Sequence, residues 1–227
     1  IRLYYEYDHK EKPVLHKGIA IHYREGDSMK IKAIDALYTG HGPIMARRDD
    51  GWISVKSHNR DIKGLEQSWL RTKTKSFADY KKVMDMLANT SNNTVYADAE
   101  GNIAYWHGNY IPKRDPKYDW SKPVDGTTSA TEWKGLTPVS AGIHIYNPPN
   151  GWLENCNSTP FTAAGKYSPK KKDYPAYMAP DGQNFRALHA IKILPEEKSY
   201  TLNKVIAKGY DTYLAAFEVL VPALIKA

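Results

Sequence analysis

The chain has 227 residues, 41% hydrophobic and 25% charged, a balance that excludes disordered, collagen-like and coiled-coil proteins. The 32 Lys and Arg exceed the 25 Asp and Glu, which gives a formal charge of +7. No apolar run approaches the roughly 20 residues that a membrane-spanning helix needs, and the single cysteine, Cys156, excludes an intrachain disulfide and any zinc site built on two cysteines.

Residues 1–60 predict mostly strands. Segments that alternate in polarity or are rich in β-formers occupy residues 1–7, 29–36, 36–45 and 51–56. The third of these contains a Gly-rich break at Gly40-His41-Gly42, which divides it into two strand-like pieces. We therefore expect an antiparallel sheet in this part of the chain.

Residues 62–90 predict helices. Residues 65–71 are typical of a short helix, and Ser76 is a suitable N-cap for a second one. The apolar side chains of the second helix recur at helical spacing: Phe77, Tyr80, Val83, Met84 and Leu87. We expect this helix to end near Asn89.

Residues 93–160 predict a hairpin, a long loop and a strand. Two β-rich runs, 93–98 and 102–107, flank a short link that contains Gly101, which is the pattern of a β-hairpin. Residues 108–149 show no sustained period, and so long a loop inside a domain is usually functional. Residues 151–157 are expected to form a short strand that ends in polar residues.

Residues 184–227 predict helices again. Residues 185–194 have a helical pattern, and the longest apolar stripe at helical spacing runs from Leu202 to Phe217. The order of strands, helices, hairpin, loop, strand and helices indicates the α+β class. Because the chain starts at Ile1 without a Met and ends in an apolar segment, we expect residues 1–227 to be a single incomplete domain, an internal fragment of a longer polypeptide.

Most familiar site motifs are absent from the sequence. There is no Gly-x-Ser-x-Gly elbow, no His-x-x-x-His pair, no phosphate loop and no dinucleotide fingerprint. The basic runs at 81–82 and 170–172 are short and separated, so we expect no nucleic acid partner. Without a long apolar run, we expect no membrane partner either. The Trp and Tyr residues of loop 108–152 leave open a non-catalytic module that binds a sugar or a peptide.

Several short motifs are specific when they are taken together. In chain order they are His41-Gly42-Pro43, Asp98-x-x-Gly101-Asn102-Ile103-x-Tyr105, Trp133-x-Gly135-Leu136-x-Pro138, Asn147-Pro148-x-x-Gly151 and Asn155-x-Asn157-x-x-Pro160. Over about residues 38–188, the chain resembles the β chain of the penicillin acylase (penicillin amidase) family of N-terminal nucleophile hydrolases.

The resemblance implies a fold and an activity. The fold is part of an αββα sandwich, two antiparallel sheets between helical layers. The activity is hydrolysis of the amide of N-acyl compounds, such as a β-lactam side chain or an acyl-homoserine lactone. The implied nucleophile is the first residue of the β chain, usually Ser, whose α-amine is the general base. Ile1 has neither hydroxyl nor thiol, so we expect the nucleophile upstream and the isolated chain to be inactive.

The resemblance also implies two site residues. Asn157 matches the asparagine whose side-chain amide contributes to the oxyanion hole, and Arg186 matches an arginine that supports it. From the residues alone, Asn157 also fits a turn asparagine and Arg186 a surface helix arginine. His107 and Asp98 are expected to serve the hairpin rather than the chemistry.

The resemblance implies no cofactor for the chemistry, but it suggests a site for a structural calcium ion. Family members use an aspartate shortly after an Asp-Tyr-Pro turn. Here Asp173-Tyr174-Pro175 is present, but Met178 occupies the corresponding position, and a thioether is a poor ligand for a hard cation. This leaves Asp173 or Asp181 as substitutes. The implied partners are a small N-acyl amide substrate and the remaining segments of the precursor, in the periplasm or secreted.

Overall fold

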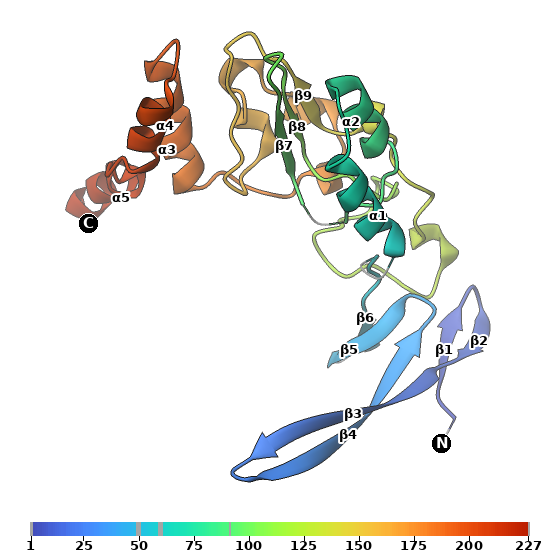
Figure 1. Ribbon diagram of the computed structural model, residues 1–227. Helices are drawn as coiled ribbons and strands as arrows, with labels where there is room; N and C mark the ends of the chain where they lie inside the picture. The colour runs from blue at the N-terminus through green and yellow to red at the C-terminus, as the bar shows by residue number, and fades with distance from the viewer. Residues whose placement is uncertain (1, 49–50, 59–60, 91, 227) are drawn as a thin grey trace. The chain divides into compact units, whose positions relative to one another are not determined.

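The computed structural model describes residues 2–48, 51–58, 61–90 and 92–226, and Ile1 lies outside them. The chain divides into two units (Figure 1). Unit 1 comprises Ile1–Arg60 and Arg114–Lys134, and unit 2 comprises Asp61–Lys113 and Gly135–Ala227. The expectation of a single incomplete domain over residues 1–227 stays a prediction.

Unit 1 consists of antiparallel strands. A two-stranded hairpin precedes a four-stranded meander in the order β3-β4-β5-β6. The strands are β1 (Tyr4–Tyr7), β2 (Lys10–Pro13), β3 (Leu15–Glu25), β4 (Ser28–Thr39), β5 (Gly42–Arg48) and β6 (Gly51–Ser54). Strands β3 and β4 form a long ribbon (Figure 1), of which only Tyr38 and Thr39 at one end pair with β5.

The predicted strands of unit 1 are present, and the part of the chain expected to be mostly strands also contains β2 and β3. The face of β3 that carries Leu15, Ile19 and Ile21 also carries Lys17, so apolar and polar residues do not alternate regularly and periodicity does not mark the strand. The predicted break lies where β4 turns into β5. At Gly42 the backbone has a φ of +138°, and a Cβ there would lie 2.2 Å from the Val55 carbonyl oxygen, so the turn requires glycine.

The first half of unit 2 places two helices beside a three-stranded antiparallel sheet in the order β7-β8-β9. The elements are α1 (Ile62–Arg71), α2 (Phe77–Met84), β7 (Thr94–Ala97), β8 (Ile103–Trp106) and β9 (His144–Tyr146). The Ser76 side chain accepts a hydrogen bond from the Asp79 amide, which confirms Ser76 as the N-cap of α2.

Helix α2 ends three residues before Leu87, the last apolar residue of the predicted stripe. Leu87 has a φ of +52°, and side chains from elsewhere bond the backbone around it. The Gln67 Oε1 atom accepts a hydrogen bond from the Ala88 amide at 2.8 Å, and Asn109 Nδ2 donates to the Met84 carbonyl at 2.8 Å. These bonds satisfy backbone groups at the helix end, so the turn replaces a further helical turn.

The core of unit 2 lies on both faces of this sheet. On one face, Ala104 and Trp106 of β8 pack with Met84 of α2 in a cluster bordered by aromatic rings. On the other face, Tyr105 and Ile145 pack with Ala163 and Ala164 of a loop. Among the described residues, every buried hydrophobic side chain belongs to unit 2.

Two short segments of unit 2, residues 111–113 and 135–137, pair with each other where segment 114–134 begins and ends; we call this pair the stem. Pro112 and Leu136 form an isolated antiparallel bridge. Beside it, the Lys113 amide donates to the Gly135 carbonyl at 2.9 Å, and the Thr137 amide donates to the Ile111 carbonyl at 2.8 Å. The stem therefore closes the base of segment 114–134, which belongs to unit 1.

Three helices end unit 2: α3 (Phe185–Ile193), α4 (Leu202–Gly209) and α5 (Ala215–Lys226). The stripe from Leu202 to Phe217 was predicted as one run, and that prediction is wrong because the chain leaves the helix after Gly209. The Asp211 side chain accepts hydrogen bonds from the Tyr213 amide at 2.9 Å and from His189 at 2.8 Å. A short polar side chain that bonds its own backbone competes with helix formation.

The long connections contain short 3₁₀ turns rather than regular elements. The prediction of a strand over 151–157 is wrong, because this segment forms no ladder and turns at Asn157. Within the described ranges, none of the helices has both the length and the hydrophobicity of a transmembrane span. The mixture of helices and antiparallel sheets confirms the α+β class.

Candidate functional site

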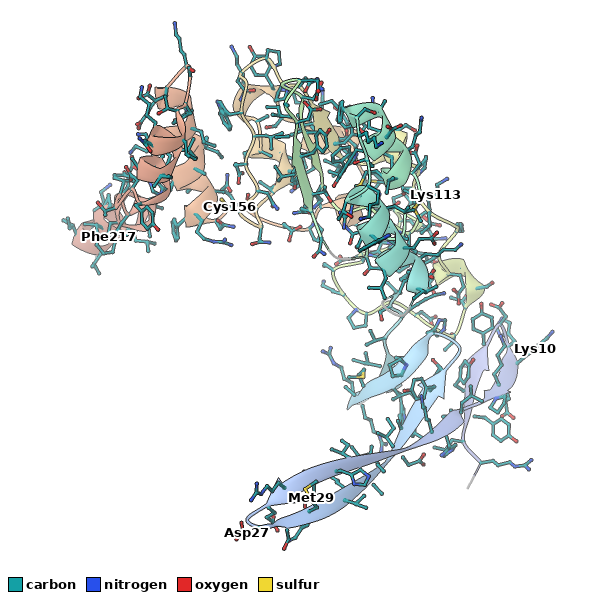
Figure 2. The ribbon with its side chains drawn as sticks, viewed as in Figure 1. Lys10, Asp27, Met29, Lys113, Cys156 and Phe217 are labelled. Atoms are coloured by element: carbon teal, nitrogen blue, oxygen red, sulfur yellow. The ribbon has the colours of Figure 1, made fainter. Side chains whose placement is uncertain are left out.

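The site that the sequence predicts centres on residues 154–158, here called the Asn157 turn (Cys156 is labelled in Figure 2). Asn157 has a φ of +54°, in the left-handed region that asparagine tolerates better than most residues. The buried Glu154 carboxylate accepts hydrogen bonds from the Cys156 amide at 2.8 Å and the Ser158 hydroxyl at 3.2 Å. One carboxylate thus bonds the backbone of the residue before Asn157 and the side chain of the residue after it.

The start of α3 holds the same turn from the other side. Asn184 is the N-cap of α3, and its Oδ1 atom accepts a hydrogen bond from the Ala187 amide at 3.0 Å. Its Nδ2 atom donates to the carbonyls of Cys156 and Asn157 at 3.0 and 3.3 Å. Two residues further on, Arg186 Nη2 donates to Asn157 Oδ1 at 3.3 Å. The structure therefore brings together the two residues that the resemblance singles out.

The orientation of the Asn157 carboxamide follows from these contacts. Its oxygen faces the Arg186 guanidinium, while its Nδ2 atom donates to none of the described residues. Both side chains are exposed, so the amide N–H groups face solvent. An N–H donor with a cation behind its carbonyl can bind an oxygen atom that gains negative charge, as in a tetrahedral intermediate.

The neighbouring thiol is not a nucleophile in this arrangement. Burial raises the pKa of Cys156 to about 11, the Glu154 carboxylate adds to this rise, and the Arg186 charge opposes it. At neutral pH the thiol is therefore protonated, whereas reactive cysteines depend on the thiolate.

His107 and Asp98 bond residues outside the Asn157 turn. Asp98 accepts hydrogen bonds from the Asn102 amide at 2.8 Å and the Tyr96 hydroxyl at 2.9 Å, within the β7–β8 hairpin. The buried His107 ring lies between the Tyr105 hydroxyl, 2.7 Å from Nδ1, and Asp181, 3.2 Å from Nε2. These contacts support the hairpin and its link to the loop before α3.

The carboxylates considered for calcium do not form a ligand set. Asp181 pairs with His107, and Asp173 and Met178 each lie in a short 3₁₀ turn. No three His, Cys, Asp or Glu side chains within the described ranges are grouped as a metal site would require. The side chains present do not fit a calcium ion at Asp173 or Asp181, and a structural calcium stays an untested expectation.

The aromatic side chains of segment 114–134 stack on cations of their own unit. The Arg114 guanidinium lies 5.4 Å from the centre of the Trp120 ring and 5.6 Å from that of Trp133. Lys56 lies 5.2 Å from the Trp133 ring, and Trp120 Nε1 donates to the Asp115 carbonyl at 2.7 Å. Both rings are half-buried. These contacts favour a packing role for the rings over the sugar or peptide site considered for loop 108–152.

Unit 1 contains a polar cluster around Glu132 that no local pattern in the sequence predicts. His41 Nδ1 lies 3.3 Å from the carboxylate, Lys56 and the Tyr7 hydroxyl donate to it, and His41 Nε2 lies 2.8 Å from the Gly126 carbonyl. The cluster joins segment 114–134 to the strands. Glu154 and Asn184 were also missed, although the Asn before residues 185–194 is a standard N-cap signal.

Comparison with known proteins gives concordant results. The family model described as penicillin amidase matches residues 2–227. Penicillin G acylase from Escherichia coli is 39% identical over 84 residues, which are 37% of this chain and 9% of that protein. A thermostable penicillin G acylase from Alcaligenes faecalis has the same fold with a TM-score of 0.67 at 20% identity, over 90% of this chain and 35% of that one.

The chain thus spans about a third of the solved relative and a smaller part of the curated one. Its motifs, its fold and the family match agree with one another, and they confirm the resemblance seen in the sequence. With a family model matching residues 2–227, the chain belongs to the penicillin amidase family.

Proposed function

We propose that this chain is part of an amidohydrolase of the N-terminal nucleophile type, and that Asn157 donates to its oxyanion hole. The observation that carries the proposal is the 3.3 Å contact between Arg186 Nη2 and Asn157 Oδ1, which leaves the amide N–H groups of Asn157 facing solvent. Family membership supports the reaction class.

In the proposed reaction, the hydroxyl or thiol of an N-terminal residue outside this chain attacks the carbonyl carbon of the substrate amide. Its α-amine accepts the proton and passes it to the leaving amine as the C–N bond breaks. Water then attacks the resulting acyl-enzyme and releases the acid. Asn157 donates to the carbonyl oxygen in both tetrahedral intermediates, and the Arg186 charge polarises the donating amide.

The proposed substrates are N-acyl compounds such as a β-lactam with an acyl side chain or an acyl-homoserine lactone. The proposed partners are the remaining segments of a precursor, and the proposed location is the periplasm or the exterior of the cell. Because the nucleophile lies outside residues 1–227 in this proposal, the chain on its own hydrolyses no amide.

Asn157→Ala in the full-length polypeptide tests the proposal. We expect kcat to fall about 10²–10³-fold, because one lost oxyanion donor costs about 3–4 kcal/mol in the transition state. The assay follows p-nitroaniline release from a panel of N-acyl p-nitroanilides with arylacetyl, short-chain and long-chain acyl groups. Circular dichroism checks that the fold is kept.

Asn203→Ala is the matched control, since Asn203 is an exposed asparagine of α4, an element separate from the Asn157 turn. This control is expected to retain the wild-type kcat on every substrate of the panel. Near-normal turnover of Asn157→Ala, with the wild type active, would remove Asn157 from the oxyanion hole.

A further inference from the structure

We propose that Asn184 is a positioning residue for Asn157, a role that rests on the function proposed above. Its carboxamide is the one described group that bonds both the backbone of the Asn157 turn and the first turn of α3. The Asn184 carboxamide thereby fixes the position of the Asn157 amide relative to the Arg186 guanidinium.

The backbone of the Asn157 turn has an unfavourable conformation. A residue with a φ of +54° is less stable than one in the right-handed or extended regions, so its surroundings must hold it there. Asn184 Nδ2 donates to the consecutive carbonyls of Cys156 and Asn157, which orients the peptide groups on both sides of the Asn157 Cα atom. The direction of the Asn157 side chain depends on that backbone.

Asn184 also fixes the start of α3. The Oδ1 atom of the same carboxamide accepts from the amide of Ala187, a completely buried residue, so the helix start is fixed against the core. Arg186 lies between these two residues in the first turn. The hydrogen bond that caps α3 therefore also fixes the backbone position from which the Arg186 side chain extends. That position allows the 3.3 Å contact between Arg186 Nη2 and Asn157 Oδ1.

The two residues before Asn184 bond a different part of the chain. The Gly182 carbonyl accepts from the Thr159 amide at 3.0 Å, and Gln183 Nε2 donates to Thr162 Oγ1 at 3.0 Å. These bonds hold the same two segments together, but they reach the chain after the Asn157 turn. Loss of the Asn184 donor should therefore disturb the turn while the segments remain attached.

Asn184→Ser and Asn184→Asp in the full-length polypeptide test this inference. Both side chains still accept the N-cap hydrogen bond, but neither offers two amide N–H donors to the turn carbonyls. We expect kcat on the anilide panel to fall about 10–100-fold while KM changes by less than about threefold, since an interaction made in the transition state is weakened. Thr201→Ala, which removes the N-cap of α4, is the control and is expected to leave kcat unchanged.

A double-mutant cycle with Asn157→Ala distinguishes positioning from a general structural effect. If Asn184 acts through Asn157, adding Asn184→Ser to Asn157→Ala lowers kcat no further. Losses that multiply, or a wild-type kcat in both Asn184 variants, would overturn the inference and leave the role of Asn157 intact. Full turnover by Asn157→Ala would instead refute the proposed function first, and this inference with it.

Discussion

His107 is a buried histidine whose surroundings suit a neutral ring. The Tyr105 hydroxyl can donate to Nδ1 while Nε2–H donates to Asp181, so both ring nitrogens are satisfied without a second proton. Burial lowers the pKa of His107, although the Asp181 charge opposes this shift. The ring therefore favours the native state when it is uncharged.

We expect the stability of unit 2 to fall as the pH decreases below about 6.5, the ordinary pKa of histidine in an unfolded chain. Below that pH, the unfolded chain binds a proton more readily than the folded one. His107→Gln should lower the free energy of unfolding by about 1–3 kcal/mol near pH 7.5 through lost buried hydrogen bonds. The difference in the free energy of unfolding between the wild type and His107→Gln should be smaller near pH 5.5 than near pH 7.5, as measured by urea denaturation.

His22→Gln is the control for this comparison, because His22 is an exposed histidine of β3. It should follow the wild type at both pH values. If the gap between wild type and His107→Gln widens on acidification, then His107 is held in its charged form by Asp181, and the assignment of a neutral ring is wrong.

At the same scale, the sequence allowed Asn157 and Arg186 to be named but neither Asn184 nor Glu154. The first two match motif positions, which one can recognise without knowing the fold. The role of Asn184 depends on a hydrogen bond to a carbonyl 28 residues earlier in the chain. Local patterns predict its place as a helix cap but not its partner across the turn.

Among the elements, α1 is joined to the end of α2 by the buried Gln67. Its Oε1 atom accepts from the Ala88 amide and its Nε2 atom donates to Asn109 Oδ1, both at 2.8 Å. Gln67→Leu would leave both partners buried without these bonds. We expect a loss of about 2–4 kcal/mol in the free energy of unfolding, seen as a lower urea midpoint with an unchanged m-value.

Glu66→Leu provides the matched comparison, since Glu66 is the exposed neighbour of Gln67 on α1. This substitution is expected to change stability by less than about 0.5 kcal/mol. Equal losses from the two substitutions would mean that the Gln67 bonds do not stabilise the junction of α1 and α2.

Elements with strong local signals were predicted well, and those set by distant contacts were not. The Ser76 cap and the link at Gly101 have short-range causes, so α2 and the β7–β8 hairpin were found. The break after Gly209 depends on Asp211, whose side chain bonds His189 of α3 as well as its own backbone. The spacing of apolar residues contains no information about such a bond, so the sequence predicted one continuous helical stripe from Leu202 to Phe217.

At the scale of the whole molecule, the buried hydrophobic residues are unevenly distributed. All those among the described residues lie in unit 2, whereas aliphatic and Met side chains of β3 and β4 are 37–67% exposed: Leu15, Ile19, Ile21, Met29, Ile31 and Ile34. Figure 2 labels Met29 near the tip of this ribbon. The β3–β4 ribbon therefore depends mainly on its own ladder for stability.

Hydrogen exchange of this chain on its own tests that conclusion. We expect the amides of β3 and β4 to exchange at least about 10-fold faster than those of β7, β8 and β9, because exposed ladders open more readily than core strands. Peptide-level mass spectrometry compares the two sheets in one sample. Equal protection of both sheets would show that the ribbon is stabilised by contacts beyond its ladder.

The α+β class and the family could be predicted from the sequence, but the division into two units could not. Class follows from the order of local patterns, and family follows from motifs that lie largely between residues 93 and 160. Segment 114–134 joins unit 1 because Glu132 bonds Lys56 and lies near His41, far earlier in the chain. No local pattern indicates partners at that separation.

The stem between Lys113 and Gly135 has a practical meaning for protein engineering. Segment 114–134 belongs to unit 1 but interrupts the sequence of unit 2, so truncation from either terminus cannot separate the two units. Its ends already meet through a backbone hydrogen bond of 2.9 Å, close to what a two-residue hairpin turn requires. Removing residues 1–60 and replacing segment 114–134 with such a turn would give unit 2 as one continuous polypeptide that contains both Asn157 and Arg186.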